Sequence, residues 1–339
     1  MPAEHHKPKA AFLCEGGSIF NVYDPETLAL LEEKLSLSRT VFRKADLEKQ
    51  PLLLADAEYI FSTWGMPAFT EAEIEKFFPR LQALFYGAGS VRGFAREFLR
   101  KGIRVFSAWG ANAVPVAEFA VSQIVLAGKG FFQGLRILER EGRAACMQYI
   151  GGFPGNYRTK VGILGAGMIG SRVCEMLKAY DFEVLVYDPF AGDDKLEVLH
   201  AQRAELDRIF TECQTISNHI ANVPETVGLL NYACFSKMKK NATFLNTGRG
   251  AQVVEADLIR ALTEEPARTA VLDVTWPEPP LPESPLWSLQ NVFLTPHIAG
   301  SMQRETARMG AFMEREFSLF LTGQPCRYEV TEEMLKTMA

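Results

Sequence analysis

The sequence has few cysteines, and none are paired at the spacing of a metal or redox site. The six cysteines of this 339-residue chain are scattered, and no CxxC motif occurs. In a chain of this length, scattered cysteines are most simply reduced thiols of the interior. We therefore expect neither disulfides nor a bound metal.

Long apolar runs and an excess of positive charge are missing as well. No hydrophobic stretch reaches the length of a membrane span, and the first ten residues, MPAEHHKPKA, lack the apolar centre of a signal peptide. The net charge of −5 provides no basic surface for nucleic acid or an anionic membrane. With 47% hydrophobic and 23% charged residues, the chain is typical of a cytoplasmic globular protein. Its length suggests two domains.

The feature around which the rest is organised is a glycine turn, GAGMIG at 165–170, between an expected strand and an expected helix. Val161–Leu164 is an apolar run of strand length, and apolar residues recur at helical spacing over 168–180. A second strand, 183–187, ends on Asp188 at the distance that a dinucleotide fingerprint requires. A glycine turn without a ligand is the alternative, but all parts of the fingerprint are in register.

Each residue of this fingerprint has a physical role. Gly165 permits the tight turn, Gly167 lets the backbone approach a pyrophosphate, and Gly170 lets helix and strand pack closely. Asp188 is expected to accept the ribose hydroxyls. Because Pro189–Phe190 follows it instead of Arg or Lys, no cation near in sequence would accept a 2′-phosphate. The pattern therefore favours NAD over NADP.

The rest of the chain alternates strands and helices, which predicts an α/β fold. Before the fingerprint, strands are expected at 10–14, 39–43, 58–62, 81–86 and 103–107, with helices from Pro25, from the Thr70 capping box and at 94–101. A long apolar helix is expected over 114–138, with Pro115 at its start. It should pack in the core, between domains or against a second subunit. After Asp188 we expect strands at 214–218, 242–246, 267–274 and 291–295, a helix at 253–262, a proline-rich loop at 276–285 and a final helix at 301–322.

Three polar residues come just after apolar strands, where open α/β sheets bind their ligands: Arg249, Glu278 and His297. A guanidinium can grip a carboxylate and polarise an adjacent carbonyl. A histidine can give or take the proton that accompanies hydride transfer, and a neighbouring carboxylate favours its imidazolium form. Alone, each residue is more often structural or solvated, but together, downstream of a nucleotide fingerprint, they indicate catalysis. Asp273 could accept the nicotinamide carboxamide, and His219 is expected to border the cofactor.

Several motifs in this order resemble the D-isomer-specific 2-hydroxyacid dehydrogenase family. They are Gly87-Ala88-Gly89, the Val116-Ala117-Glu118 segment, GAGMIG, NTGRG at 246–250, LDVTWPEP at 272–279 and LTPHIAG at 294–300. The resemblance covers about residues 80–322. It implies two Rossmann-like domains, in which a parallel-sheet NAD-binding domain (111–299) is inserted in a smaller flavodoxin-like substrate domain (1–110 with 300–339). It also implies homodimers formed by the nucleotide domain.

The resemblance assigns roles by motif position. Arg249 is similar to the family's substrate-carboxylate arginine, Glu278 to its histidine-orienting glutamate and His297 to its acid–base. The turn Ala88-Gly89-Ser90 resembles its backbone-amide carboxylate cradle. Trp64, which departs from the family pattern, is also expected to contact the substrate. The expected NAD contacts are Gly165, Gly167, Met168, Ile169, Gly170, Asp188, His219, Ala221, Thr226, Thr247, Gly248, Asp273, His297 and Gly300.

The chain departs from the family pattern on the substrate side. Ser90-Val91-Arg92 replaces a common Val-Asp, and Ala221 stands where proline is common. Trp64 and Phe85–Tyr86 replace the basic residues with which phosphoglycerate-type members hold a phosphate. We therefore expect NAD-dependent interconversion of an unphosphorylated D-2-hydroxy acid, of glyoxylate/hydroxypyruvate type or larger and apolar, and its 2-oxo acid.

The alternatives are a 3-phosphoglycerate dehydrogenase and an NAD(H)-sensing interaction protein of the same fold. A formate dehydrogenase is disfavoured, because that group carries Gln where this chain has Glu278.

Overall fold

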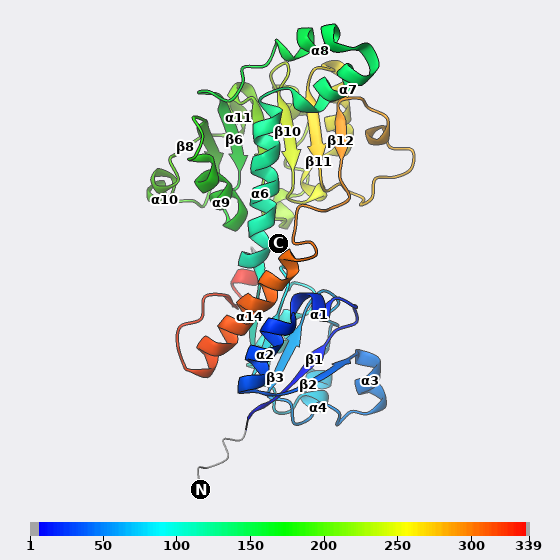
Figure 1. Ribbon diagram of the computed structural model, residues 1–339, viewed down its shortest axis with the longest axis vertical. Coiled ribbons are helices and arrows are strands. Elements are labelled where there is room, and N and C mark those ends of the chain that lie inside the picture. The colour runs from blue at the N-terminus through cyan, green and yellow to red at the C-terminus, as the bar shows by residue number, and fades with distance from the viewer. Residues whose placement is uncertain (1–6, 337–339) are drawn as a thin grey trace. The chain divides into compact units, whose positions relative to one another are not determined.

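The computed structural model describes residues 7–336, which form two compact units. One unit extends to Asn112 and resumes at Ser301, and the other comprises Ala113–Gly300. Each is built on a largely parallel sheet with helices on its faces (Figure 1). This is the α/β fold with two Rossmann-like units that the sequence predicts.

The sheet of the first unit has the strand order β13-β5-β4-β3-β1-β2, in which only β13 is antiparallel to its neighbour. Apart from β13, this is the flavodoxin-like order. The strands are β1 (Lys9–Leu13), β2 (Ser36–Phe42), β3 (Tyr59–Ser62), β4 (Ala83–Tyr86), β5 (Arg104–Ser107) and β13 (Glu329–Val330). The two-residue β13 is too short to leave a sequence pattern, and the other five overlap the expected strands.

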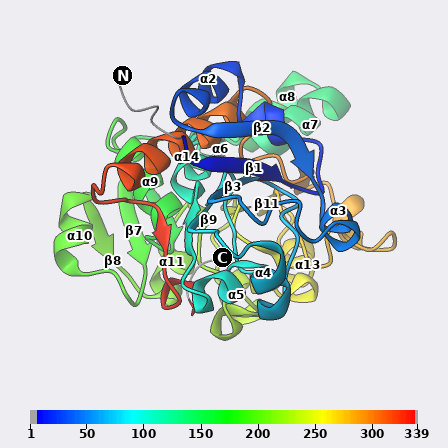
Figure 2. The ribbon, with the colours of Figure 1, turned by 90° about the horizontal axis from the view of Figure 1, so that it is seen from below.

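Helices cover both faces of this sheet, as Figure 2 shows, with α2 and α14 on one side and α4 and α5 on the other. Asp24 caps α2 by accepting a hydrogen bond from the Thr27 N–H at 2.9 Å, and Thr70 and Glu73 form the expected capping box on α4. The helices are α1 (Ile19–Val22), α2 (Pro25–Lys34), α3 (Lys44–Lys49), α4 (Glu71–Phe77), α5 (Ala95–Arg100) and α14 (Glu305–Leu321).

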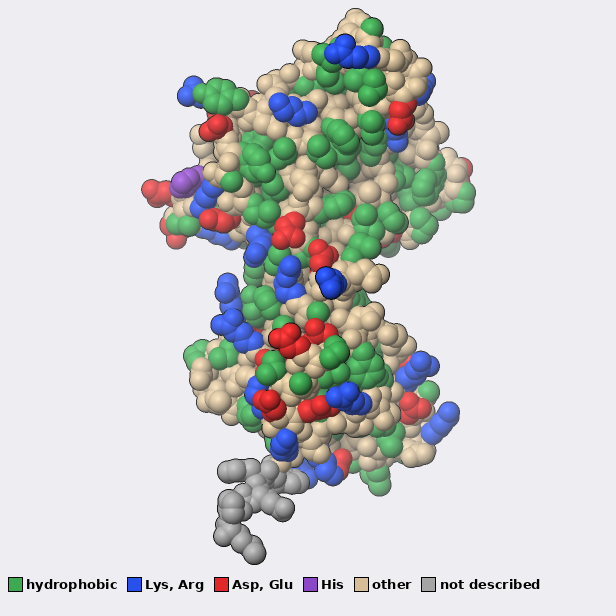
Figure 3. Space-filling view, viewed as in Figure 1, with side chains coloured by type: hydrophobic (Ala, Val, Ile, Leu, Met, Phe, Trp, Pro, Cys, Tyr) green, Lys and Arg blue, Asp and Glu red, His purple; other side chains and the backbone are tan. Residues whose placement is uncertain are grey.

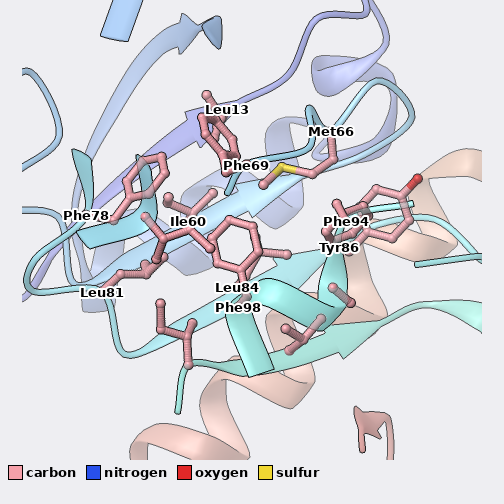
Figure 4. Packing of buried hydrophobic residues seen from close by; sticks show 14 of the residues in the cluster. Leu13, Ile60, Met66, Phe69, Phe78, Leu81, Leu84, Tyr86, Phe94 and Phe98 are labelled. Carbon is pink, nitrogen blue, oxygen red and sulfur yellow. The ribbon is translucent and has the colours of Figure 1, made fainter. Parts of the chain in front are cut away.

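Aromatic side chains dominate the two cores of the first unit. On one face, Phe69, Phe78 and Phe98 pack edge to face over Ile60 and Leu84 (Figure 4). On the other face, the strand residues Phe61, Phe85 and Phe106 meet α14, which contributes Met309, Met313 and Phe317. Because both faces are buried there, the strands β1, β3, β4 and β5 are largely apolar, whereas the edge strand β2 is mostly exposed and contains polar residues.

The sheet of the second unit has seven parallel strands in the order β12-β11-β10-β9-β6-β7-β8. The order reverses between β6 and β9, which is the switch point where such sheets bind nucleotides. The strands are β6 (Lys160–Leu164), β7 (Glu183–Tyr187), β8 (Ala201–Arg203), β9 (Thr215–Asn218), β10 (Thr243–Asn246), β11 (Thr269–Leu272) and β12 (Val292–Leu294). Strand β8 was not predicted, because it is an edge strand of three residues without an apolar pattern.

The expectation of a single apolar helix over 114–138 is wrong. Helix α6 begins at Trp109, encloses Pro115 and ends at Ala127, and a separate helix α7 begins at Phe131. Gly130 breaks the helix because its φ is +67°, and a Cβ on Gly128 would lie 1.9 Å from the Asn156 side chain. Pro115 costs α6 one backbone hydrogen bond but does not end it.

The remaining helices flank the second sheet. They are α6 (Trp109–Ala127), α7 (Phe131–Glu141), α8 (Arg143–Ile150), α9 (Met168–Leu177), α10 (Asp193–Val198), α11 (Leu206–Glu212), α12 (Tyr232–Phe235) and α13 (Glu255–Glu264). Short 3₁₀ turns lie at Pro224–Thr226, Gly250–Gln252, Pro285–Trp287 and Met334–Lys336. Two further helices have ends that differ from expectation: α9 stops at Leu177 instead of residue 180, and α14 starts at Glu305 instead of residue 301.

Helix α6 is long and apolar enough in composition to cross a bilayer, but 67% of its apolar stretch is buried inside the protein. Its residues Ala117, Ala120, Val121 and Ile124 pack on the strands of the second sheet, as the core helix of a soluble protein does.

Acidic and basic side chains are interspersed on the face seen in Figure 3. All six cysteines are free thiols.

Candidate active site

The glycine turn lies between β6 and α9, and its first and last glycines are required by close contacts. Gly165 has a φ of +87°, and a Cβ there would lie 2.8 Å from the His219 carbonyl oxygen. A Cβ on Gly170 would lie 1.9 Å from the Gly165 carbonyl oxygen. A Cβ on Gly167, in contrast, would meet nothing within 4 Å, so the middle of the turn is open to a ligand.

Asp188 braces this turn with its carboxylate. Its Oδ2 accepts a hydrogen bond from the Ala166 N–H at 2.7 Å, and its Oδ1 accepts from Phe190 at 2.8 Å and Ala191 at 3.1 Å. The expected role at the ribose therefore comes in addition to a structural one. The fold also brings up two cations that are distant in sequence: Lys195 donates to the Ala166 carbonyl and Arg203 to that of Asp188.

His297 and Glu278 form a direct pair. The loop after β11 carries Glu278, the turn after β12 carries His297, and His297 Nδ1 lies 2.6 Å from Glu278 Oε1. The His297 side chain is 48% exposed, so the remaining ring nitrogen can reach a ligand from solvent. His297 has a left-handed backbone with φ of +57°, so the turn holds an unusual conformation at this residue.

Arg249 presents a desolvated charge in the same unit. It follows β10, and burial lowers the pKa of its guanidinium, while the negative charge of Glu278 acts in the opposite direction. Its Nη1 donates to the Gly248 carbonyl oxygen at 2.8 Å. Among the described residues, no carboxylate forms an ion pair with it. A partly buried cation without a counter-ion favours an anionic ligand.

Asp273 holds the turn that carries His297. Its Oδ1 accepts from Thr295 Oγ1 at 2.6 Å and from the Ile298 N–H at 2.8 Å, and its Oδ2 accepts from the Ala299 N–H at 2.9 Å. Its carbonyl oxygen accepts from the His297 N–H at 3.1 Å. This role could not be predicted from the sequence, because an acid at a strand end does not reveal which loop it will bind.

His219 is fully buried between strand ends. Its ring contacts Ser217 Oγ at 2.9 Å and Thr247 Oγ1 at 3.3 Å, and burial lowers its pKa to about 4. The ring is therefore neutral near pH 7. Thr226, another expected NAD contact, donates to the Ala221 carbonyl oxygen at 2.7 Å and so closes the loop after β9.

The expected substrate cradle lies in the first unit, after β4. Ser107 Oγ donates to the carbonyl oxygen of Ala88 at 2.9 Å, and Thr63 Oγ1 donates to that of Gly87 at 2.9 Å. The N–H groups of Gly89 and Ser90 have no acceptor among residues 7–336. The Trp64 side chain, on the loop after β3, is 40% exposed.

Comparison with known proteins identifies the second unit. Residues 139–299 match the model for the NAD-binding domain of D-isomer specific 2-hydroxyacid dehydrogenases. A D-3-phosphoglycerate dehydrogenase from Archaeoglobus fulgidus is 32% identical over 232 residues, which are 68% of this chain and 43% of that protein. The 2-hydroxyacid dehydrogenase YoaD of Bacillus subtilis, whose assignment is itself provisional, is 34% identical over 206 residues, 60% of this chain and 59% of that protein.

The second unit is therefore an NAD-binding domain of the D-isomer specific 2-hydroxyacid dehydrogenase family. The chain spans about two-fifths to three-fifths of the length of these relatives. The fold agrees with that of an NAD-complexed family member from Lactobacillus delbrueckii ssp. bulgaricus, with a TM-score of 0.76 at 18% identity, over 95% of this chain and all of the other.

NAD is the cofactor of this family's nucleotide domain, and the residues of this chain fit it. At the start of α9, the N–H groups of Gly167, Met168 and Ile169 have no acceptor in the described part of the chain, as a pyrophosphate site requires. Met168 is exposed, and Gly300 follows the His297 turn in the same unit. Within residues 7–336, no three His, Cys, Asp or Glu side chains gather as metal ligands.

Proposed function

We propose that this protein is an NAD-dependent dehydrogenase that interconverts a D-2-hydroxy acid and its 2-oxo acid. The observation that carries the proposal is the 2.6 Å pair of His297 and Glu278 in the same nucleotide-binding unit as an unpaired, half-buried Arg249. A proton donor and a carboxylate-binding cation are the two groups that reduction of a 2-oxo acid needs from the protein.

Each residue has a defined task in this reaction. Arg249 binds the substrate carboxylate and polarises the C2 carbonyl. Bound NADH supplies the hydride to C2. His297 gives its proton to the C2 oxygen and recovers it in the reverse direction, and Glu278 fixes the orientation of the ring through Nδ1.

The substrate we propose is unphosphorylated. Trp64 offers an aromatic surface where a phosphate would need cations, which favours glyoxylate, hydroxypyruvate or a larger apolar 2-oxo acid. The second candidate is a phosphorylated hydroxy acid, because the relative from Archaeoglobus fulgidus is a D-3-phosphoglycerate dehydrogenase.

The experiment that tests this is NADH oxidation with a panel of 2-oxo acids: glyoxylate, hydroxypyruvate, phosphohydroxypyruvate and phenylpyruvate. Turnover of an unphosphorylated acid, with formation of the D-product, is the expected result. Preference for phosphohydroxypyruvate would select the second candidate. No turnover of any acid by protein that binds NADH would instead favour an NAD(H)-sensing interaction protein.

We also propose that the protein is a cytoplasmic homodimer formed through the nucleotide-binding unit. Phe131, Leu135 and Leu138 lie at helical spacing on α7 and are each more than two-fifths exposed, and Met147 on α8 is 51% exposed. The other face of α7 is fixed to its own sheet by Arg136, which lies 3.8 Å over the Phe293 ring. An anchored helix with an apolar outer face fits an isologous contact with a second copy.

A further inference from the structure

Three buried carboxamide side chains lie together at the carboxyl ends of β9 and β10. Asn218, Asn246 and Gln252 are 0%, 1% and 0% exposed. Asn218 Nδ2 donates to Asn246 Oδ1 at 3.0 Å and to Gln252 Oε1 at 2.6 Å. We refer to these three residues as the carboxamide cluster.

The carboxamide cluster forms hydrogen bonds with the backbone of the loop that carries Arg249. Gln252 Oε1 accepts from the Arg249 N–H at 3.4 Å, and Asn246 Nδ2 donates to the Arg249 carbonyl oxygen at 3.3 Å. Asn246 Oδ1 also accepts from the Gly248 N–H at 3.1 Å. Both backbone polar groups of Arg249 are therefore bound by side chains of the cluster.

The same cluster ties this loop to the one after β9. Gln252 Nε2 donates to the Ile220 carbonyl oxygen at 2.6 Å, and Asn218 Oδ1 accepts from the Ile220 N–H at 3.2 Å. All three carboxamides thus use both their oxygen and their nitrogen. A buried carboxamide is costly unless it is fully bonded, and a fully bonded network fixes one geometry.

Close packing leaves the Arg249 loop little room to move. A Cβ on Gly248 would lie 3.1 Å from both Asn218 Nδ2 and Gln252 Oε1, directly over the cluster. A Cβ on Gly250 would lie 1.9 Å from the Thr275 carbonyl carbon, so the loop rests against the segment that leads to Glu278. Arg249 is therefore flanked by a tight contact at Gly248 and by one at Gly250 that leaves no room for a Cβ.

We propose that Asn218, Asn246 and Gln252 are positioning residues that set the Arg249 guanidinium for the substrate carboxylate. This inference rests on the proposed function of Arg249. The cluster acts through Arg249, so loosening it weakens carboxylate binding but leaves NADH binding unchanged. A displacement of about 1 Å at such a group is sufficient to lower the reaction about 100-fold.

The test compares Gln252→Leu with a matched control, Gln214→Leu. Gln214 is also buried, at 4% exposure, but its amide donates only to the Asn241 carbonyl oxygen, at the opposite end of β9. For Gln252→Leu we expect KM for the best 2-oxo acid, and Kd for oxamate on the NADH-bound protein, to rise about tenfold to 100-fold. The NADH Kd should stay within about twofold, and Gln214→Leu should change none of the three.

A double variant and calorimetric oxamate binding are added, so that each possible result either supports or overturns the inference. If Gln252→Leu does not fold, the double variant Asn218→Leu/Gln252→Leu replaces the bonded pair with an apolar pair, and the same loss of oxamate affinity is expected. Equal effects in Gln252→Leu and Gln214→Leu, or unchanged oxamate binding in the folded variants, would overturn the inference. If the wild type turns over no 2-oxo acid, the proposed function fails. The role of the carboxamide cluster is then decided by oxamate binding, measured by calorimetry. A wild type that binds no oxamate overturns that role as well.

Discussion

At the residue scale, the polar side chains at the carboxyl ends of the strands divide into those that face a ligand and those that face the protein. His297 is half exposed, and Arg249 keeps an unpaired guanidinium. The polar side-chain atoms of Asp188, Asp273 and His219 instead form hydrogen bonds with neighbouring loops of the protein. The first group should affect catalysis directly, and the second should act by holding the first in place.

Replacing His297 by alanine removes the proposed proton donor. We expect kcat for 2-oxo acid reduction to fall about 10²- to 10⁴-fold, because general acid–base catalysis contributes about that factor. NADH binding, measured by fluorescence, should persist. A folded His297→Ala protein with near-native turnover would refute the role.

Asp273→Asn should loosen the His297 turn without touching the substrate. An amide replaces one of the two oxygens that accept from Thr295, Ile298 and Ala299, so His297 loses part of its support. We expect kcat to fall about tenfold or more, with a lower Tm. Asp257→Asn is the control, since Asp257 accepts only from the Tyr232 N–H in this structure. Equal kcat losses in both variants would rule out the positioning role.

These residues also show what the sequence can and cannot reveal. The positions of Arg249, Glu278 and His297 after strands of one sheet were predictable, because each follows an apolar run and parallel strands end at the same edge. The carboxamide cluster was not, because Asn218 and Gln252 meet only through the strand order of the folded sheet. The cations Lys195 and Arg203 beside Asp188 were missed for the same reason.

At the element scale, the sequence predicted where most strands and helices lie. It did not predict where a long helix is interrupted. The fingerprint strands and the capped helices α2 and α4 occur at the expected places, because local hydrogen bonds determine them. The single helix over 114–138 fails because proline is usually a helix start, whereas six residues of α6 precede Pro115. The break instead occurs at Gly130, which has a positive φ and where a Cβ would lie 2.7 Å from the Phe153 ring.

The division into α6 and α7 matters for assembly, since it is α7 that carries the apolar outer face. Leu138→Lys places a charge on this face without disturbing buried residues, so we expect the proposed homodimer to dissociate to monomers. Sedimentation velocity measures the change. Leu52→Lys, at an 80% exposed leucine of the first unit, should leave the dimer intact. A Leu138→Lys protein that remains dimeric at micromolar concentration would exclude this face as the interface.

At the scale of the whole molecule, stability in acid should depend on His219. Burial lowers the pKa of this ring from 6.5 to about 4, so the native state keeps it neutral where the unfolded chain protonates it. The unfolded state then binds more protons between pH 6.5 and about 4, and the free energy of unfolding must fall as the pH falls through that window. The size of the effect is about 3 kcal/mol, at about 1.4 kcal/mol for each pH unit.

His219→Gln removes this titration and keeps a polar side chain near Ser217 and Thr247. Its free energy of unfolding, measured in urea, should start lower at pH 8 because the ring's contacts are lost. It should then decline less steeply than the wild type's toward pH 4. His200→Gln, at an exposed histidine of the same unit, should follow the wild-type curve. Parallel curves for His219→Gln and the wild type over this range would mean that the ring is not held neutral, and that the ends of β9 and β10 admit water in the native protein.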